Sequence, residues 1–283
     1  MLINTFIIGA AKAGTTYVAN YLNQHIEVEL GIGKELNLFH KNIPKREDIK
    51  NKFKKNNRIL IDASPVYSEC SIFSSTAANI YKYNKNAKLI YLVRDPIDRI
   101  QSAFKQALKT GHHNKRNKYG IAMPTDINDA VRLYSPLLTS SAYYFNVSCF
   151  LKFFPRNQLH LIFFDKLFNQ KYMIDELRAL NNFLDLEGNE LEISFEKINS
   201  TREISEFPPY VPKIYTDLKN KSPLHNVETP DFLKRMTCPS HKMNFDLNHS
   251  TMRFIKAVLF SDVKNLYRLC DIPNDPWSID DWL

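Results

Sequence analysis

Apolar and polar positions alternate along the chain in blocks that predict strands and helices in turn. Short apolar runs bounded by Gly, Pro or charged residues are typical of buried strands. Four such runs stand at residues 2–8, 59–63, 88–93 and 159–164. Apolar positions three or four residues apart predict helices. Such patterns occur from the loop after Gly9 to about Gln24 and over residues 71–83, 96–109, 137–154, 173–184 and 250–269.

The order of these elements predicts the fold class. Strands alternate with helices over at least residues 2–184, which favours an α/β fold with a parallel sheet and helices on both faces. After residue 190 the pattern weakens, and no repeat, low-complexity linker or domain boundary is visible. A chain of 283 residues is long enough for one large α/β domain, so residues 1–283 are predicted to form a single domain.

Composition narrows the class of partner. Hydrophobic residues make up 44% and charged residues 24%, which excludes disordered and collagen-like chains. There are 38 Lys and Arg against 30 Asp and Glu, a net charge of +8. This excess favours an anionic partner such as a nucleotide, phosphate, sulfate or polysaccharide, and solubility alone is the alternative. Basic residues gather in 34–58 and 105–118, where a solvated face is the usual explanation.

Targeting and redox signals are sparse. No run of 18 uncharged apolar residues exists, so no membrane span is predicted. The N-terminus lacks the basic start of a signal peptide, and Lys12 interrupts its apolar run. The four cysteines are far apart and form no zinc motif, so we expect no metal. A cytoplasmic location with free thiols is the resulting expectation.

Glycine is concentrated at one end of the chain. The sequence contains only 7 glycines, and four of them, Gly9, Gly14, Gly31 and Gly33, fall within 25 residues. The segment GAAKAGTT, residues 9–16, forms a glycine-bounded loop between a strand and a helix, where backbone N–H groups and the helix dipole suit an anion. Its spacing is that of a P-loop, but Thr15 stands in place of the Walker lysine and Lys12 lies inside the loop. The loop therefore favours a smaller anion over a triphosphate with magnesium; an ordinary strand–turn–helix junction is the alternative.

A second anion motif follows the apolar run 88–93. Arg94 stands at the carboxyl end of this predicted strand, where open α/β sheets bind ligands. Ser102 lies one to two turns into the next predicted helix, which begins at Pro96. An arginine and a serine hydroxyl in this order suit a phosphate group. The alternatives are a structural ion pair for Arg94 and a solvent-facing hydroxyl for Ser102.

In these motifs the chain resembles the sulfotransferase family. GAAKAGTT is similar to its 5′-phosphosulfate loop, and RDPIDRIQS, residues 94–102, is similar to its 3′-phosphate motif. GKELNLF, residues 33–39, resembles the segment that carries the catalytic acid in heparan-sulfate-type and many bacterial members. DASPVY, residues 62–67, resembles their Ser-Pro-x-Tyr segment, and weaker matches continue to the C-terminal helix.

The resemblance implies a three-layer, P-loop nucleotide-kinase-like fold with a central parallel sheet. It also implies 3′-phosphoadenosine 5′-phosphosulfate (PAPS) as donor, in-line transfer of its sulfonate to a hydroxyl or amine, the bisphosphate product PAP, and no metal. The implied donor-binding residues are Lys12, Ala13, Gly14, Thr15, Thr16, Arg94 and Ser102. A third donor contact is expected from Thr201 and Arg202, next to Ser200, with Lys234, Arg235 or Lys242 as alternatives.

Catalytic roles follow from the same resemblance. Lys12 is expected to stabilise the departing phosphate, and Glu35 is expected to be the base. An ion pair with a nearby lysine is the alternative role for Glu35. His40 is the second candidate for the base, and Asp62 is the third. Residues expected to contact the acceptor are Asp62, Ser64, Tyr67 and Tyr143.

Two departures from the heparan-sulfate-type pattern bear on the acceptor. Ala63 stands where these members have lysine, and Asn37 stands where they have histidine. We therefore expect a bacterial enzyme that modifies a small metabolite or natural product, with a saccharide acceptor as the alternative. The sequence predicts no nucleic-acid partner and leaves the oligomeric state open.

Two other functions compete with a sulfotransferase. A P-loop kinase would need a lysine at position 15 and a magnesium-binding acid, for which Asp95 is the available residue. A polyanion- or nucleic-acid-binding module would use the two basic runs and bind with a steep salt dependence, but no recognisable nucleic-acid-binding motif is present.

Overall fold

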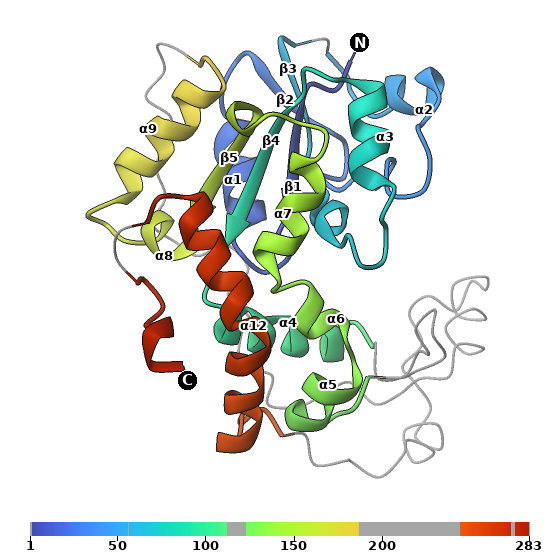
Figure 1. Ribbon diagram of the computed structural model, residues 1–283. Helices are drawn as coiled ribbons and strands as arrows, with labels where there is room; N and C mark the ends of the chain where they lie inside the picture. The colour runs from blue at the N-terminus through green and yellow to red at the C-terminus, as the bar shows by residue number, and fades with distance from the viewer. Residues whose placement is uncertain (1, 56, 112–122, 187–243, 273–274, 283) are drawn as a thin grey trace, which may run out of the picture.

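The fold is built on one five-stranded parallel sheet (Figure 1). The computed structural model describes residues 2–55, 57–111, 123–186, 244–272 and 275–282. The strands lie in the order β2-β3-β1-β4-β5, and every neighbouring pair is parallel. Their bounds are β1 Thr5–Gly9, β2 Val28–Leu30, β3 Ile59–Asp62, β4 Lys88–Val93 and β5 Leu159–Phe163. This confirms the predicted α/β class with a central parallel sheet.

Burial explains which strands the sequence reveals. β4 has five fully buried residues, Leu89 to Val93, and β1 is buried along its whole length. Strands buried on both faces are continuous apolar runs, so their pattern is plain. β2 was not predicted because it is a three-residue edge strand in which Glu29 and Leu30 are only partly buried.

Helices cover both faces of the sheet (Figure 1). α1 (Thr15–Leu22) and α9 (Met173–Phe183) lie together on one face, where the Asn181 amide donates to the Tyr21 hydroxyl at 2.9 Å. α3 (Thr76–Tyr83), α7 (Tyr143–Leu151) and α12 (His249–Leu269) lie on the other face, in front of the sheet in this view. α4 (Pro96–Lys109) crosses below the carboxyl ends of the strands.

The predicted helix over 137–154 is wrong as a single element. The structure has α6 (Pro136–Thr139) and α7 instead, separated by a short turn. The guanidinium of Arg99 donates to Leu137 O and Ser141 Oγ at this turn, and the Asp262 carboxylate accepts from Tyr144 N at 2.9 Å at the start of α7. Partners distant in sequence therefore break a continuous apolar pattern.

Other helix boundaries also differ from the prediction. The pattern over 71–83 contains α3 only from Thr76 onward, after a short 3₁₀ helix, η1, at Pro65–Ser68. Further short elements in the described residues were not predicted, among them the 3₁₀ helix η3 (Arg156–Gln158) before β5. The others are α2 (Arg46–Lys50), α5 (Ile127–Leu133), α8 (Phe164–Leu167) and the C-terminal η4 (Ile279–Trp282).

The strand order fixes where a ligand would bind. The chain leaves β1, forms β2 and β3 on one side, and then crosses to β4 on the other side of β1. In open α/β sheets, ligands bind outside the carboxyl ends of the strands at such a reversal. The segments that leave β1, β3 and β4 therefore meet at one edge, and all three carry motifs singled out in the sequence.

Candidate active site

The loop after β1 leads directly into the N-terminus of α1. The helix begins at Thr15, and its N-cap is Gly14, so no side chain caps it and no acidic residue lies in its first turn. The first N–H groups of a helix lack partners within the helix and carry its positive dipole end. The end of α1 is therefore available to an anion.

Two glycines shape this loop. A Cβ added at Gly9 would lie 2.2 Å from Ser68 Oγ and 2.8 Å from the Tyr91 ring, so a side chain would displace the segment that follows β3. Gly14 has φ +94°, a left-handed conformation that favours glycine. The loop thus depends on glycine for close approach at one end and for its turn at the other.

Lys12 supplies a cation inside the loop. It is half-buried and has φ +73°, which is uncommon for a residue with a side chain. Burial lowers the pKa of Lys12, and the charges of Arg94, Lys109 and Lys34 lower it further. Several cations therefore converge, and within the described residues Lys12 forms no ion pair with a carboxylate, an arrangement that a bound anion would relieve.

Arg94 lies at the carboxyl end of β4, beside this loop. Its guanidinium donates to Lys12 O at 3.5 Å and to Asp98 Oδ2 at 3.1 Å, and it stacks over Phe164 at 4.6 Å. The ion pair with the exposed Asp98 was the structural alternative expected from the sequence, and it is present. Within the described residues, Arg94 Nε is nevertheless buried without a hydrogen-bond partner. The side chain therefore keeps an unused donor.

The helix after Arg94 is α4, which begins at Pro96 as predicted. Asp95 is its N-cap and accepts from Asp98 N at 2.9 Å. Asp95 is the acid that a kinase would need to bind magnesium, and here it has a structural role as a helix cap. Ser102 lies in the second turn of α4 and is partly exposed.

The proposed base lies on the segment between β2 and α2. Glu35 is exposed and forms an ion pair with Lys34 at 3.1 Å, which is the alternative role expected for it. Exposed pairs of this kind contribute about 0–1 kcal/mol, so the pair does not prevent Glu35 from acting as a base. Lys34 Nζ also donates to Thr15 Oγ1 at 3.4 Å, which brings this segment against the first residue of α1.

The segment after Glu35 is held by residues at the end of β3 and just after it. Leu36 N donates to Asp62 at 3.3 Å, Asn37 N donates to Ser64 Oγ at 2.9 Å, and Leu38 N donates to the Tyr67 hydroxyl at 2.8 Å. Asp62, Ser64 and Tyr67 are themselves fully buried. Their burial favours a positioning role over the direct contact with an acceptor that the sequence predicted.

His40 and Tyr143 also lie in buried or partly buried surroundings. The His40 ring packs against Phe73 at 4.9 Å, and its Nδ1 is buried without a partner among the described residues. Tyr143 is fully buried and its hydroxyl donates to Arg94 O at 2.7 Å. Tyr143 therefore supports the backbone of Arg94, again a positioning contact.

Sequence reasoning missed two basic residues. Lys34 was noted only as a neighbour of Glu35, yet it contacts both Glu35 and Thr15. Arg99 lies within the RDPIDRIQS motif and is 1% exposed, with its guanidinium bonded to Ser141 Oγ and Leu137 O. The available signal was a second arginine in that motif, five residues after the first. Its burial could not be predicted from the motif, because that burial depends on α6 and α7.

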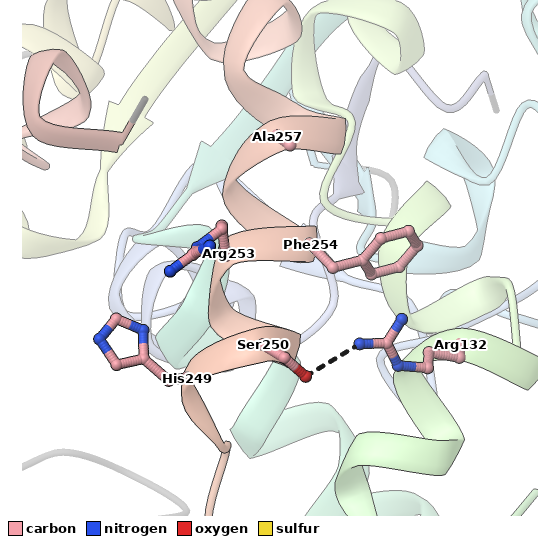
Figure 2. Close-up of a pocket in the computed structure, with 6 residues that line it drawn as sticks. All are labelled: Arg132, His249, Ser250, Arg253, Phe254 and Ala257. Carbon is pink, nitrogen blue, oxygen red and sulfur yellow. Dashed lines mark hydrogen bonds between the residues drawn. The ribbon is translucent and has the colours of Figure 1, made fainter.

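A separate hollow lies between α5 and the start of α12 (Figure 2). It encloses about 500 Å³, and the Arg132 guanidinium donates to Ser250 Oγ at 3.3 Å and stacks over Phe254 at 5.0 Å. His249, Arg253 and Ala257 complete its lining. None of these residues belongs to the segments that leave β1, β3 and β4, so the hollow is distinct from the candidate site.

Some of the predicted site residues lie outside the described part of the chain, and two further predictions concern a metal site and a membrane span. The Ser200, Thr201 and Arg202 segment and the alternatives Lys234, Arg235 and Lys242 lie outside the described residues. In the parts of the chain that are described, no three His, Cys, Asp or Glu side chains form a metal-binding group. Of the described helices, none combines the length and apolar character needed to cross a bilayer. The cytoplasmic location stays a prediction.

Comparison with known proteins assigns the family. The model described as "Sulfotransferase domain" matches residues 2–246. The human protein heparan sulfate glucosamine 3-O-sulfotransferase 5 is 28% identical over 200 residues, which cover 65% of this chain and 54% of the relative. The mouse protein of the same name is 28% identical over 193 residues. The chain spans about half the length of these curated relatives.

A solved structure agrees in fold. A sulfotransferase from Alicyclobacillus acidocaldarius superposes with a TM-score of 0.63 at 18% identity, covering 98% of this chain and 99% of that one. At this identity the likeness shows the shared fold. The family match covers residues 2–246, which include the β1 loop and the motifs that follow β2, β3 and β4. This chain therefore belongs to the sulfotransferase family.

Proposed function

We propose that this sulfotransferase uses PAPS as donor and binds it at the β1 loop, with Glu35 as the base that activates the acceptor. The observation that carries the proposal is the convergence of Lys12, Arg94 and Lys34 on the uncapped N-terminus of α1. Residues 1–283 are proposed to act as one sulfotransferase domain. The packing of the C-terminal Trp277 against Tyr143, with ring centroids 6.0 Å apart, supports this.

The residues present suit the two phosphate groups of this donor. The free N–H groups of α1 and the Lys12 ammonium fit a 5′-phosphate, and the glycine-bounded loop leaves its backbone open to close approach. The unpartnered Nε of Arg94 and the hydroxyl of Ser102 fit a 3′-phosphate. The donor has no triphosphate, which agrees with Thr15 in place of a Walker lysine.

The donor, when bound, supplies a sulfonate group attached to a phosphate. Lys12 and the N–H groups of Ala13, Gly14, Thr15 and Thr16 would stabilise negative charge on that phosphate as the sulfonate leaves. Glu35 would take the proton from the acceptor hydroxyl through a side-chain carboxylate oxygen. Lys34 touches both Thr15 and Glu35, so it would lie between donor and acceptor.

For the acceptor we propose a small hydroxylated metabolite or natural product. Ala63, which stands where heparan-sulfate-type members have lysine, is fully buried beneath the Lys34–Phe39 segment. Its N–H donates to Lys34 O at 3.2 Å. The acceptor side therefore lacks that cation. A saccharide is the second candidate, because the curated relatives are named as acting on heparan sulfate glucosamine.

Ligand-induced thermal stabilisation tests the donor. Adenosine 3′,5′-bisphosphate at 100 times its dissociation constant should add ~2.7 kcal/mol of stability, which for a protein of this size raises Tm by roughly 4–5 °C. ATP with magnesium should raise Tm less. Greater stabilisation by magnesium ATP than by the bisphosphate would contradict the proposed donor.

A further inference from the structure

The segment that carries Glu35 is held by hydrogen bonds to side chains rather than by pairing with a strand. Four consecutive backbone N–H groups, those of residues 36–39, donate to three side chains, one on the last residue of β3 and two in the segment after it. Leu36 N donates to Asp62, Asn37 N donates to Ser64, and Leu38 N and Phe39 N donate to the Tyr67 hydroxyl. We call Asp62, Ser64 and Tyr67 the β3 clamp.

When the Asp62 carboxylate is ionised, the donors and acceptors of the β3 clamp fit only one arrangement of protons. The Ser64 and Tyr67 hydroxyls each donate to a different oxygen of the Asp62 carboxylate. A hydroxyl has one proton to donate and lone pairs with which to accept. Because both protons point to Asp62, the remaining lone pairs face the backbone N–H groups of residues 37–39. Burial raises the pKa of Tyr67, which keeps its hydroxyl protonated for this role.

Packing fixes the same segment from the side. Leu36 and Phe39 are buried, whereas Glu35 between the clamp and α1 is exposed. The Phe39 ring lies 5.3 Å from that of Phe6 and 6.1 Å from that of Tyr67. The clamp therefore anchors one side of the segment to β3 while leaving the Glu35 carboxylate free.

We infer that Asp62 is a positioning residue for sulfonate transfer, which orients the Ser64 and Tyr67 hydroxyls so that they hold the Glu35 segment against the donor loop. The inference rests on the proposed role of Glu35 as base. Asparagine at position 62 would present an NH₂ group to one of the two hydroxyls. That hydroxyl would have to turn its proton toward a backbone N–H group, and the hydrogen bond there would be lost.

A double-mutant cycle between Asp62→Asn and Glu35→Gln tests this. Asp62→Asn alone should lower kcat roughly ten- to hundredfold, the loss of about one charge-assisted hydrogen bond, while the affinity for adenosine 3′,5′-bisphosphate stays the same. In the Glu35→Gln background it should change kcat by no more than about twofold, because the base it positions is already gone. A general structural role would instead lower kcat equally in both backgrounds.

Tyr67→Phe provides a second variant in case Asp62→Asn fails to fold. It should also lower kcat, since it removes the bonds to Leu38 N and Phe39 N while keeping the ring. Tyr83→Phe is the matched control, because its hydroxyl accepts from Ile3 N at 2.9 Å and its ring also packs on Phe39. Tyr83→Phe should leave kcat near wild type.

The outcomes separate this inference from the proposed function. If Glu35→Gln is as active as wild type, the proposed base and the inference both fail. If Glu35→Gln is impaired but the two losses multiply, or if folded Tyr67→Phe has wild-type kcat, the inference alone fails. Loss of bisphosphate binding in either clamp variant would also overturn it, because a residue acting through Glu35 should leave the donor site intact.

Discussion

Lys34 Nζ lies 3.4 Å from Thr15 Oγ1, so the segment that precedes the candidate base touches the first residue of the helix that begins at the donor loop. The same ammonium pairs with Glu35 at 3.1 Å. One side chain thus links the proposed donor side of the site to the proposed acceptor side.

Replacing Lys34 by Met should therefore slow transfer. The change removes a charge between the donor loop and the base but keeps the length of the side chain. We expect kcat to fall roughly ten- to hundredfold, the equivalent of one charge-assisted hydrogen bond. Steady-state kinetics with the donor varied measure this. The exposed Lys82 on α3 gives a control variant, Lys82→Met, and equal activity of the two variants would remove Lys34 from the site.

Glu35→Gln should lower kcat by about 10²–10⁴ while leaving bisphosphate binding unchanged, because the amide cannot accept the acceptor proton. Glu27→Gln is a matched control, since Glu27 forms a similar exposed ion pair with Arg58 at 2.9 Å. Turnover and calorimetric binding are measured on both. If Glu35→Gln keeps its activity, His40 or Asp62 becomes the candidate base.

Arg94→Ala should weaken recognition of the 3′-phosphate specifically. The wild-type protein should bind adenosine 3′,5′-bisphosphate more tightly than adenosine 5′-phosphate, and the variant should lose most of that preference, roughly ten- to hundredfold. Ser102→Ala should also reduce this preference for the bisphosphate, by a smaller factor. Arg178→Ala controls for the loss of an exposed arginine in an ion pair. An unchanged preference in Arg94→Ala contradicts the assignment.

Asp62 should make stability depend on pH. Burial raises the pKa of Asp62 to about 6 against the hydrogen bonds from Ser64, Tyr67 and Leu36, which lower it, and the nearby Glu35 raises it slightly. The folded protein then holds this proton more tightly than the unfolded chain, so the contribution to stability is present below about pH 4 and is lost as pH rises through about 6.

Urea unfolding of wild type and Asp62→Asn at a series of pH values measures this contribution. The free energy of unfolding of wild type, relative to the variant, should fall by up to about 3 kcal/mol between about pH 4 and pH 7. A difference that does not vary with pH would mean that Asp62 has an ordinary pKa in the folded protein.

Four of the five strands of the sheet and the order of the motifs could be predicted from the sequence, because they depend on local patterns. β4 is a buried apolar run followed by Arg94 and Pro96, and both the strand and the start of α4 are where the pattern predicted them. Arg94 and the Lys12 loop are neighbours in space because β1 and β4 are adjacent in the sheet. The family and the fold class were therefore accessible without coordinates.

What the sequence missed depends on contacts between distant segments. The break between α6 and α7 follows from Arg99, 38 to 42 residues away along the chain. Likewise, the positioning contacts of Asp62 join it to Leu36 across 26 residues. From the sequence alone, a polar residue near a motif is interpreted as a ligand contact. Only its burial in the structure distinguishes a structural role from a ligand contact.

The central claim, that the β1 loop holds the donor through Lys12, is tested most directly by calorimetric titration with adenosine 3′,5′-bisphosphate. Wild type and the control Lys82→Ala should bind one equivalent with the same affinity, and Lys12→Ala should bind roughly ten- to hundredfold more weakly and turn over about 10²–10³ more slowly. Equal binding by Lys12→Ala and wild type, or no saturable binding by wild type, would contradict the claim.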